Sequence, residues 1–299
     1  MHTIDLAYVG RGLHEELVAY VADQQNFYED EGVHVSLRDG IPWVAPGGDA
    51  ERLRHCVTIG VGGTLLSRLT RGIPWVALTV NTHRPLFWFL ARPGVESLED
   101  LAGRRLAVHA PHTPPGCFAR IVLRKAGLDP DRDVQTVVRR PGDYGMDLRR
   151  LQDGTIDAAY VGSTMAPEAI AAEYGWQVLA WVGDHFQIPT VGLVVDPTYI
   201  DPDGPAVQAL VRAHRRALQV IHNDPDTTVR YMSEFLSRHT EEEVRAHYKS
   251  FFEPYYTTDG QADLAVGESA ITAVAAELGV PASVTAAEFY RTASSGQAT

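Results

Sequence analysis

The sequence has few cysteines, no long apolar run and no cluster of basic residues, and each absence excludes a class of protein. Cys56 and Cys117 are the only cysteines among 299 residues, which excludes a disulfide framework and a zinc site built mainly from thiolates. No apolar run approaches the ~18 residues that a membrane-spanning helix needs. The 26 lysines and arginines against 38 aspartates and glutamates give a net charge of -12, so neither nucleic acid nor an anionic membrane is an expected partner.

The N-terminus also lacks the features of a secretory signal. Residues 1–9 lead from Met1 directly into a strand-like run, without a basic region, an apolar stretch or a cleavage site. Two interpretations follow, and both stay open. The chain is extracytoplasmic if a signal was removed, and it is cytoplasmic if Met1 is the native start.

Short runs rich in valine, isoleucine and alanine alternate with amphipathic helices over the first 182 residues. Eight runs are predicted strands: 4–9, 33–37, 57–61, 75–80, 106–110, 134–139, 156–161 and 176–182. Strands that alternate with helices indicate an α/β fold with mainly parallel sheets flanked by helices. One long helix is predicted over residues 14–31, and beyond residue 196 the pattern is almost entirely helical.

The length of 299 residues suits about two domains. Proline and glycine punctuation near residues 92–94 and 183–189 predicts two crossings between lobes. We therefore expect a discontinuous first lobe of residues 1–90 plus 190–299 and a second lobe of residues 91–189, with a cleft between them.

Three segments carry a resemblance to a known family. Residues 20–35 combine a helix, the aromatic pair Phe27-Tyr28 and a Glu-Gly turn before a strand; residues 97–108 are a capped turn that leads into a strand; residues 151–162 are a helix–glycine–strand unit. In this order and spacing they resemble the NMT1/THI5-like family of type II periplasmic binding proteins, over roughly residues 4–220. Asn26 stands where the family usually has glycine, a modest departure because asparagine tolerates left-handed geometry.

The resemblance implies a two-lobed protein that closes on a small organic ligand, needs no cofactor and delivers its cargo to an ABC permease. The family includes importer subunits for sulfonates, aromatic compounds and pyrimidine precursors. Related proteins on the same scaffold are enzymes, namely a pyrimidine synthase and a biphenyl desulfinase, so the resemblance leaves the activity open.

Loops at the carboxyl ends of the predicted strands supply the candidate ligand-binding residues, because open α/β sheets bind ligands there. The candidates are Arg11, His14, Gly62, Gly63, Thr64, His83, His109, Thr113, Gly116, Tyr160, Ser163, Thr164 and His185. Two turns that begin helices, at residues 62–64 and 113–116, are expected to oppose each other and to hold an anionic or carbonyl-bearing ligand through N–H groups and hydroxyls. Helix capping is the alternative role for the threonines and for Ser163.

Five of the twelve histidines fall at predicted strand ends or crossings, which suits ligand hydrogen bonds or acid/base work. No pair has the i, i+4 spacing of a metalloprotease motif, so no metal site is predicted. Cys117 begins a predicted helix and is the alternative catalytic residue, because an exposed thiol there would have a lowered pKa; a buried structural role is the competing interpretation.

Aromatic and cationic side chains near the crossings have two interpretations. Phe87 and its neighbours either stack on a flat ligand or pack the strands between the lobes. Arg84 and Arg139 are cationic candidates for an acidic ligand or are solvated. The leading hypothesis is therefore a solute-binding protein of an ABC-type importer. A cytoplasmic enzyme that uses a histidine or Cys117 is the alternative, and an intracellular sensor is a third hypothesis that requires a partner module.

Overall fold

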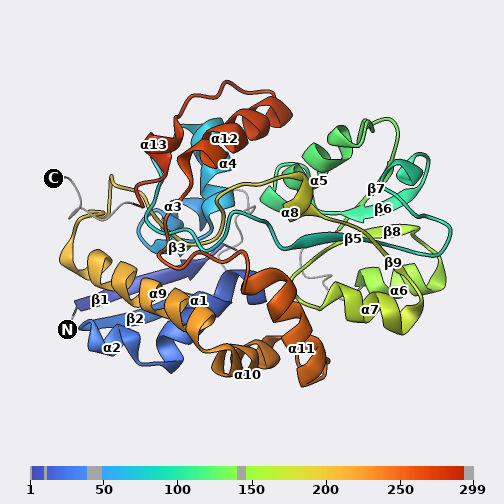
Figure 1. The fold of residues 1–299 in the computed structure, drawn as a ribbon. Coiled ribbons are helices and arrows are strands. Elements are labelled where there is room, and N and C mark those ends of the chain that lie inside the picture. The colour runs from blue at the N-terminus through green and yellow to red at the C-terminus, as the bar shows by residue number, and fades with distance from the viewer. Residues whose placement is uncertain (1, 10–11, 39–48, 140–145, 293–299) are drawn as a thin grey trace.

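Two α/β lobes lie side by side in the computed structural model, which describes residues 2–9, 12–38, 49–139 and 146–292 (Figure 1). The strands are β1 His2–Tyr8, β2 Val33–Arg38, β3 Val57–Ile59, β4 Val76–Ala77, β5 Phe87–Ala91, β6 Arg105–Val108, β7 Gln135–Val138, β8 Ala158–Gly162, β9 Gln177–Trp181 and β10 Leu193–Val195. The helices are α1 Leu13–Gln24, α2 Phe27–Asp30, α3 Asp49–Leu53, α4 Val61–Arg71, α5 Pro114–Lys125, α6 Met146–Asp153, α7 Pro167–Tyr174, α8 Val182–His185, α9 Pro205–Asn223, α10 Pro225–Phe235, α11 Glu241–His247, α12 Leu264–Leu278 and α13 Ala286–Phe289, with short turns η1 Glu99–Leu101 and η2 Tyr248–Phe252.

Each lobe is built on one five-stranded sheet, and the two sheets have the same topology. The first sheet has the order β2-β1-β3-β10-β4 and the second has the order β7-β6-β8-β5-β9. In each sheet one strand runs against the others: β10 in the first and β5 in the second. This strand is the one that enters from the other lobe. The predicted two-lobed α/β fold with mainly parallel sheets is therefore confirmed.

Two crossings join the lobes. Residues 78–86 carry the chain from β4 to β5, and residues 182–192 return it from β9 to β10. The first crossing thus precedes β5, whereas the sequence placed it near residues 92–94, because the aromatic run of β5 was not recognised as a strand of the second sheet. The division into residues 1–90 plus 190–299 and 91–189 stays a prediction.

The two crossings pair with each other and with a segment near residue 256. Thr190 donates its backbone N–H to the carbonyl of Thr82 at 2.8 Å, and Val80 donates to the carbonyl of Gly260 at 2.9 Å. Val191 has a φ of 53°, a left-handed conformation that is rare for a β-branched residue. Three short segments are therefore hydrogen-bonded to one another where the chain passes between the lobes.

The predicted helices show where local sequence determines local structure. Asn26 has a φ of 57° and divides the predicted helix 14–31 into α1 and α2, as its tolerance of left-handed geometry allows. Helix α9 begins with Pro205 at its first turn. Its buried residues recur every three or four positions and pack against α1, α2 and β1: Val207, Leu210, Val211, His214, Ala217, Leu218 and Ile221.

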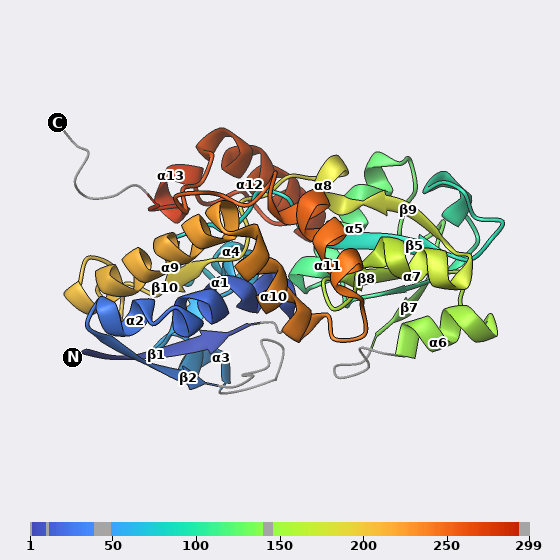
Figure 2. The same ribbon diagram turned by 60° about the horizontal axis from the view of Figure 1, so that its bottom comes forward.

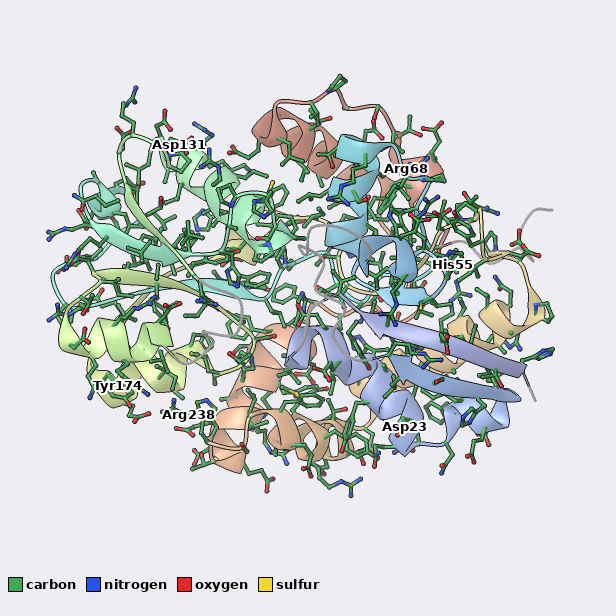
Figure 3. The ribbon with its side chains drawn as sticks, turned by 180° about the vertical axis from the view of Figure 1, so that it is seen from behind. Asp23, His55, Arg68, Asp131, Tyr174 and Arg238 are labelled. Carbon is green, nitrogen blue, oxygen red and sulfur yellow. The ribbon has the colours of Figure 1, made fainter. Side chains whose placement is uncertain are left out.

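The C-terminal helices reach from the first lobe to the second. Helices α10 and α11 extend toward α7 of the second lobe (Figure 2). There His239 accepts a hydrogen bond from the backbone N–H of Ala166 at 3.1 Å, and Arg238 pairs with Glu173 at 3.1 Å. Arg238 lies beside the helix that carries Tyr174 (Figure 3). Among the described residues, no helix combines the length and the apolar composition that a membrane crossing requires.

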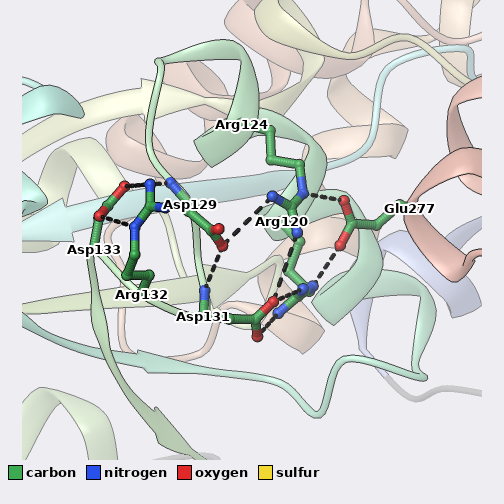
Figure 4. Close-up of polar contacts among 7 residues, drawn as sticks. All are labelled: Arg120, Arg124, Asp129, Asp131, Arg132, Asp133 and Glu277. Carbon is green, nitrogen blue, oxygen red and sulfur yellow. Dashed lines mark hydrogen bonds and ion pairs between the residues drawn. The ribbon is translucent and has the colours of Figure 1, made fainter.

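Helix α12 provides another contact between the lobes. It packs against α4 and α13 on one side and against α5 of the second lobe on the other. Glu277 accepts hydrogen bonds from Arg120 at 2.5 Å and from Arg124 at 2.7 Å, both on α5 (Figure 4). Together with the contacts of Arg238 and His239, these bonds hold the lobes against each other.

Candidate functional site

Side chains from both lobes meet around the ring of Phe87. Phe87 stacks on Tyr160 with ring centroids 5.3 Å apart and an interplanar angle of 13°. The imidazole rings of His14 and His109 meet the ring of Phe87 in edge-to-face geometry, with ring centroids 6.3 Å and 6.2 Å away. We call these four residues together with Arg139 the interlobe cluster.

The chain places most members of the cluster at or next to the end of an element. His14 lies in the first turn of α1, while Phe87 begins β5 and Tyr160 belongs to β8. His109 directly follows β6. Arg139 follows β7 and donates its backbone N–H to the carbonyl of Val108 at 2.8 Å, which brings it beside His109. Three of the predicted candidates, His14, His109 and Tyr160, therefore lie around one ring, and their role in ligand binding stays a prediction.

Helix α1 is held by the loop that follows β8. The backbone N–H of His14 donates to Oγ of Ser163 at 2.9 Å. Gly12 has a φ of 132°, and a Cβ atom there would lie 3.5 Å from Cγ2 of Thr164. Ser163 thus caps α1, a helix of the other lobe. The sequence offered two roles for this hydroxyl, ligand donor and helix cap, and did not indicate a cap across the lobes. Thr164 lies at the same contact.

Three polar atoms of the cluster are buried without a hydrogen-bond partner among the described residues. They are Nε2 of His14, Nδ1 of His109 and the hydroxyl of Tyr160. His14 is 2% exposed and Tyr160 is 0% exposed. Because buried polar groups in proteins are nearly always paired, such atoms need a partner that is not among the described residues, and a bound ligand can supply one.

The electrostatics of the cluster are close to neutral. Burial lowers the pKa of His14 to about 3, and burial together with the charge of Arg139 lowers the pKa of His109 to about 3. Burial raises the pKa of the Glu15 carboxyl, at the start of α1, to about 8. Arg139 is balanced by Asp147, whose Oδ2 lies 2.6 Å from the arginine Nε. At pH 7 these described groups therefore carry no net charge.

A contact from the C-terminal part of the chain completes the surroundings of His14. The hydroxyl of Tyr256 lies 3.3 Å from Nδ1 of His14. Sequence reasoning missed Tyr256, Glu15 and Asp147, and no local pattern marks them, because their partners are set by the tertiary fold.

A small hollow beside the cluster is lined by Arg139, Asp147, Leu148, Val161, Gly162, Thr164 and Met165.

The two helix-start turns oppose each other as predicted, but they are in contact. A Cβ atom at Gly62 would lie 3.2 Å from Cβ of Pro114 and 3.3 Å from the ring of Phe118. A Cβ atom at Gly116 would lie 2.0 Å from the carbonyl oxygen of Ala110. Gly116 therefore permits a close approach of two backbone segments. Gly63 is buried in the first turn of α4.

The threonine hydroxyls in these turns already have backbone partners. Thr64 donates to the carbonyls of Gly60 at 3.1 Å and Val61 at 2.9 Å. Thr113 donates to the carbonyl of Ala110 at 2.6 Å and accepts from the N–H of Gly116 at 3.3 Å. Their expected role as ligand donors is therefore replaced by backbone bonding, and for Thr113 the capping interpretation fits.

The remaining candidates lie elsewhere. Nε2 of His83 accepts a hydrogen bond from the N–H of Asp263 at 2.8 Å, just before α12. His185 is exposed at the end of α8. Arg11 lies outside the described residues. Cys117 is 0% exposed, and burial raises its pKa to about 12. This is opposite to the lowered pKa that a thiolate nucleophile needs.

Among the described residues, no group of three or more histidine, cysteine, aspartate or glutamate side chains comes together in a way that could hold a metal ion.

Comparison with known proteins identifies related sequences and folds. A family model described as NMT1/THI5 like matches residues 15–228. Among curated proteins none matches this chain significantly. The alkanesulfonate-binding protein SsuA from Xanthomonas axonopodis pv. citri, bound to MOPS, has a TM-score of 0.74 at 15% identity, covering 97% of this chain and 98% of its own.

Two further structures show the same fold. The periplasmic aliphatic sulphonate binding protein SsuA from Escherichia coli has a TM-score of 0.71 at 15% identity and covers 93% of this chain and 92% of its own. The desulfurization enzyme DSZB has a TM-score of 0.66 at 16% identity, and the match covers 97% of this chain and 96% of its own. At these identities the likeness concerns the fold alone.

Proposed function

This chain belongs to the NMT1/THI5-like family, and from that membership and the interlobe cluster we propose that it is the solute-binding protein of an ABC-type importer. It would trap a small anionic or carbonyl-bearing organic molecule between its lobes and present the closed form to a permease. The observation that carries the proposal is the set of buried, unpaired polar atoms on His14, His109 and Tyr160, at the place where the lobes meet.

Hinge closure explains why these atoms are buried yet unpaired. His14 comes from the first lobe, and His109 and Tyr160 come from the second. When the lobes separate, His14 leaves the ring of Phe87, and water enters between the lobes. When they close on a ligand, the ligand replaces that water, and the stacked rings of Phe87 and Tyr160 exclude the rest. Binding energy then comes from directed hydrogen bonds in a dry site.

The solved neighbours support a binding role. Two of them are sulfonate-binding proteins, and another is the ligand-binding component of an ABC-type import system from Staphylococcus aureus, with a TM-score of 0.70 at 11% identity. The likeness to DSZB favours the alternative of an enzyme on the same scaffold. Against it, the described cluster holds two imidazoles whose pKa is far below 7 and no thiol. Such groups suit hydrogen bonding better than proton transfer at neutral pH.

Closure and turnover are separated by one experiment. The protein is unfolded, dialysed and refolded to remove any bound compound, and then titrated with MOPS, butanesulfonate, biphenyl-2-sulfinate, benzoate and benzamide. We expect at least one compound to raise the melting temperature and to reduce the radius of gyration in small-angle scattering. At a concentration of 100 times Kd the stabilisation is about 2.7 kcal/mol.

A matched pair of variants locates the binding site. Phe87→Ala opens the interlobe cluster and should abolish the response, whereas His185 is exposed at the end of α8 and is not a member of the cluster, so His185→Ala should keep it. Conversion of a bound compound to product, followed by chromatography, would instead establish the enzyme. Binding without any change in the radius of gyration would also contradict closure.

A further inference from the structure

A line of polar contacts runs from Asp147 through Arg139 to His109. Oδ2 of Asp147 accepts from Nε of Arg139 at 2.6 Å. Nη2 of Arg139 donates to the carbonyl of Tyr160 at 2.9 Å, and its Nη1 lies 3.2 Å from Nε2 of His109. The arginine and aspartate side chains are only 8% and 4% exposed. Arg139 is therefore fixed on two sides before it meets the histidine.

This contact determines which nitrogen of His109 carries the proton. A guanidinium has five N–H donors and no acceptor. The hydrogen bond between Nη1 and Nε2 therefore requires an unprotonated Nε2, so the proton of the neutral ring must lie on Nδ1. Burial and the charge of Arg139 also hold the pKa of His109 at about 3, so the ring is neutral over the physiological range.

The resulting Nδ1–H group is buried and has no partner among the described residues. The imidazole ring cannot turn away easily, because it packs edge-to-face against Phe87 and Tyr160, with ring centroids 6.2 Å and 5.8 Å apart. A fixed N–H donor without a partner among the described residues thus lies within the interlobe cluster. Its natural complement is a hydrogen-bond acceptor.

We propose that Asp147 and Arg139 are positioning residues that hold His109 as the Nδ1–H tautomer, and that the ligand group facing His109 is a hydrogen-bond acceptor, such as a carbonyl or carboxylate oxygen. The second half of this proposal rests on the proposed binding function. The first half concerns the free protein alone and is tested without a ligand.

The tautomer is measured by NMR on protein labelled with ¹⁵N-histidine. We expect Nδ1 of His109 to give the pyrrole-type signal of a protonated nitrogen and Nε2 the pyridine-type signal of an acceptor. Arg139→Met should shift the ring toward the Nε2–H tautomer. Arg150→Met is the matched control, because Arg150 pairs with the same Asp147 at 3.4 Å but makes no hydrogen bond to His109; it should leave the tautomer unchanged.

The wild-type spectrum decides this half even if Arg139→Met fails to fold. An Nε2–H tautomer in the wild type overturns the positioning role. An unchanged Nδ1–H tautomer in folded Arg139→Met overturns it as well, because the ring would then be set by something other than the arginine.

The ligand half uses three aromatic probes and two variants. Benzamide and benzoate offer an oxygen acceptor, whereas benzylamine offers only donors. In His109→Asn the amide N–H lies near the position of Nδ1–H, and in His109→Gln it lies near that of Nε2. We expect the acceptor probes to move the Nδ1 signal of His109 and benzylamine to leave it unmoved. His109→Gln should weaken benzamide binding by about tenfold, or about 1.4 kcal/mol, and His109→Asn by much less.

Each failure has a distinct meaning. A response to benzylamine alone, or equal losses in both variants, overturns the acceptor assignment. No response of Nδ1 to benzamide or benzoate at millimolar concentration overturns it too. None of these outcomes touches the proposed function, which fails if no compound causes closure in the scattering experiment or if a bound compound is converted to product.

Discussion

Glu277 is expected to contribute far more to stability than the other carboxylate that binds the same arginine. Its side chain is 4% exposed, and it accepts one hydrogen bond each from Arg120 and Arg124. Asp131 accepts two hydrogen bonds from Arg120, at 2.7 and 2.5 Å, but is 65% exposed. Figure 4 shows both carboxylates around the same guanidinium. The pair Glu277→Gln and Asp131→Asn therefore compares a buried and an exposed carboxylate that each accept two hydrogen bonds from arginine.

The magnitudes follow from burial. A hydrogen bond to a charged group contributes about 1.5–3 kcal/mol, and glutamine retains one of the two acceptors of Glu277 without its charge. We expect Glu277→Gln to lower the free energy of unfolding by about 2–3 kcal/mol. For a chain of this size that corresponds to a fall in melting temperature of roughly 4–6 °C. Asp131→Asn should cost less than about 1 kcal/mol, because solvent screens an exposed pair.

Urea unfolding followed by circular dichroism measures both values. A repeat in 1 M sodium chloride should reduce the effect of Asp131→Asn and leave that of Glu277→Gln nearly unchanged, since buried pairs are screened less. Because Glu277 joins α12 to α5 of the second lobe, Glu277→Gln should also enlarge the radius of gyration of the ligand-free protein. Equal losses in the two variants, or no loss in Glu277→Gln, would refute this reasoning.

Four further outcomes are expected. Thr113→Ala removes the cap of α5 and should lower stability by about 1 kcal/mol while benzamide affinity is unchanged; a loss of affinity alone would restore its role as a ligand donor. The Cys117 thiol, whose pKa is raised to about 12, should resist an aromatic disulfide reagent in the native protein and react after unfolding. Burial raises the pKa of the Glu15 carboxyl to about 8 from an ordinary 4.5. Between these two pH values the folded state binds more protons than the unfolded state, so the free energy of unfolding should fall as pH rises from 4.5 to 8. Glu15→Gln should remove that dependence when melting temperatures are measured across this pH range. His214 has a pKa of about 3 against 6.5, so the unfolded state takes up its proton first and stability should fall as pH drops from 6.5 to 3; His214→Gln should make that fall shallower.

The pattern of apolar runs predicted the strands that are followed by a helix or a turn and missed the two that run antiparallel. All eight predicted runs overlap strands of the structure. β10 has three residues, and β5 is an aromatic run directly after a crossing. Neither follows the local alternation of strand and helix, because each pairs with strands of a lobe it enters from outside. This is also why the first crossing was placed near residues 92–94.

The strand-end rule brought together part of the candidate site. It selected His14, His109 and Tyr160, which the structure places around Phe87. It could not identify the role of Thr113, because a helix cap and a ligand donor use the same hydroxyl in the same position. It could not find Tyr256, since 242 residues separate it from His14 and only the tertiary fold makes them neighbours.

The position of β10 between β3 and β4 has a consequence for how the chain folds during synthesis. β4 pairs only with β10 in the first sheet, so it leaves the ribosome long before its partner exists. At about 5–20 residues per second, the interval is on the order of ten seconds. The second sheet uses only the contiguous residues 87–181 and is complete earlier. We therefore expect the nascent chain to complete the sheet of its second lobe first. The sheet of the first lobe stays incomplete until β10 is synthesised and pairs with β3 and β4.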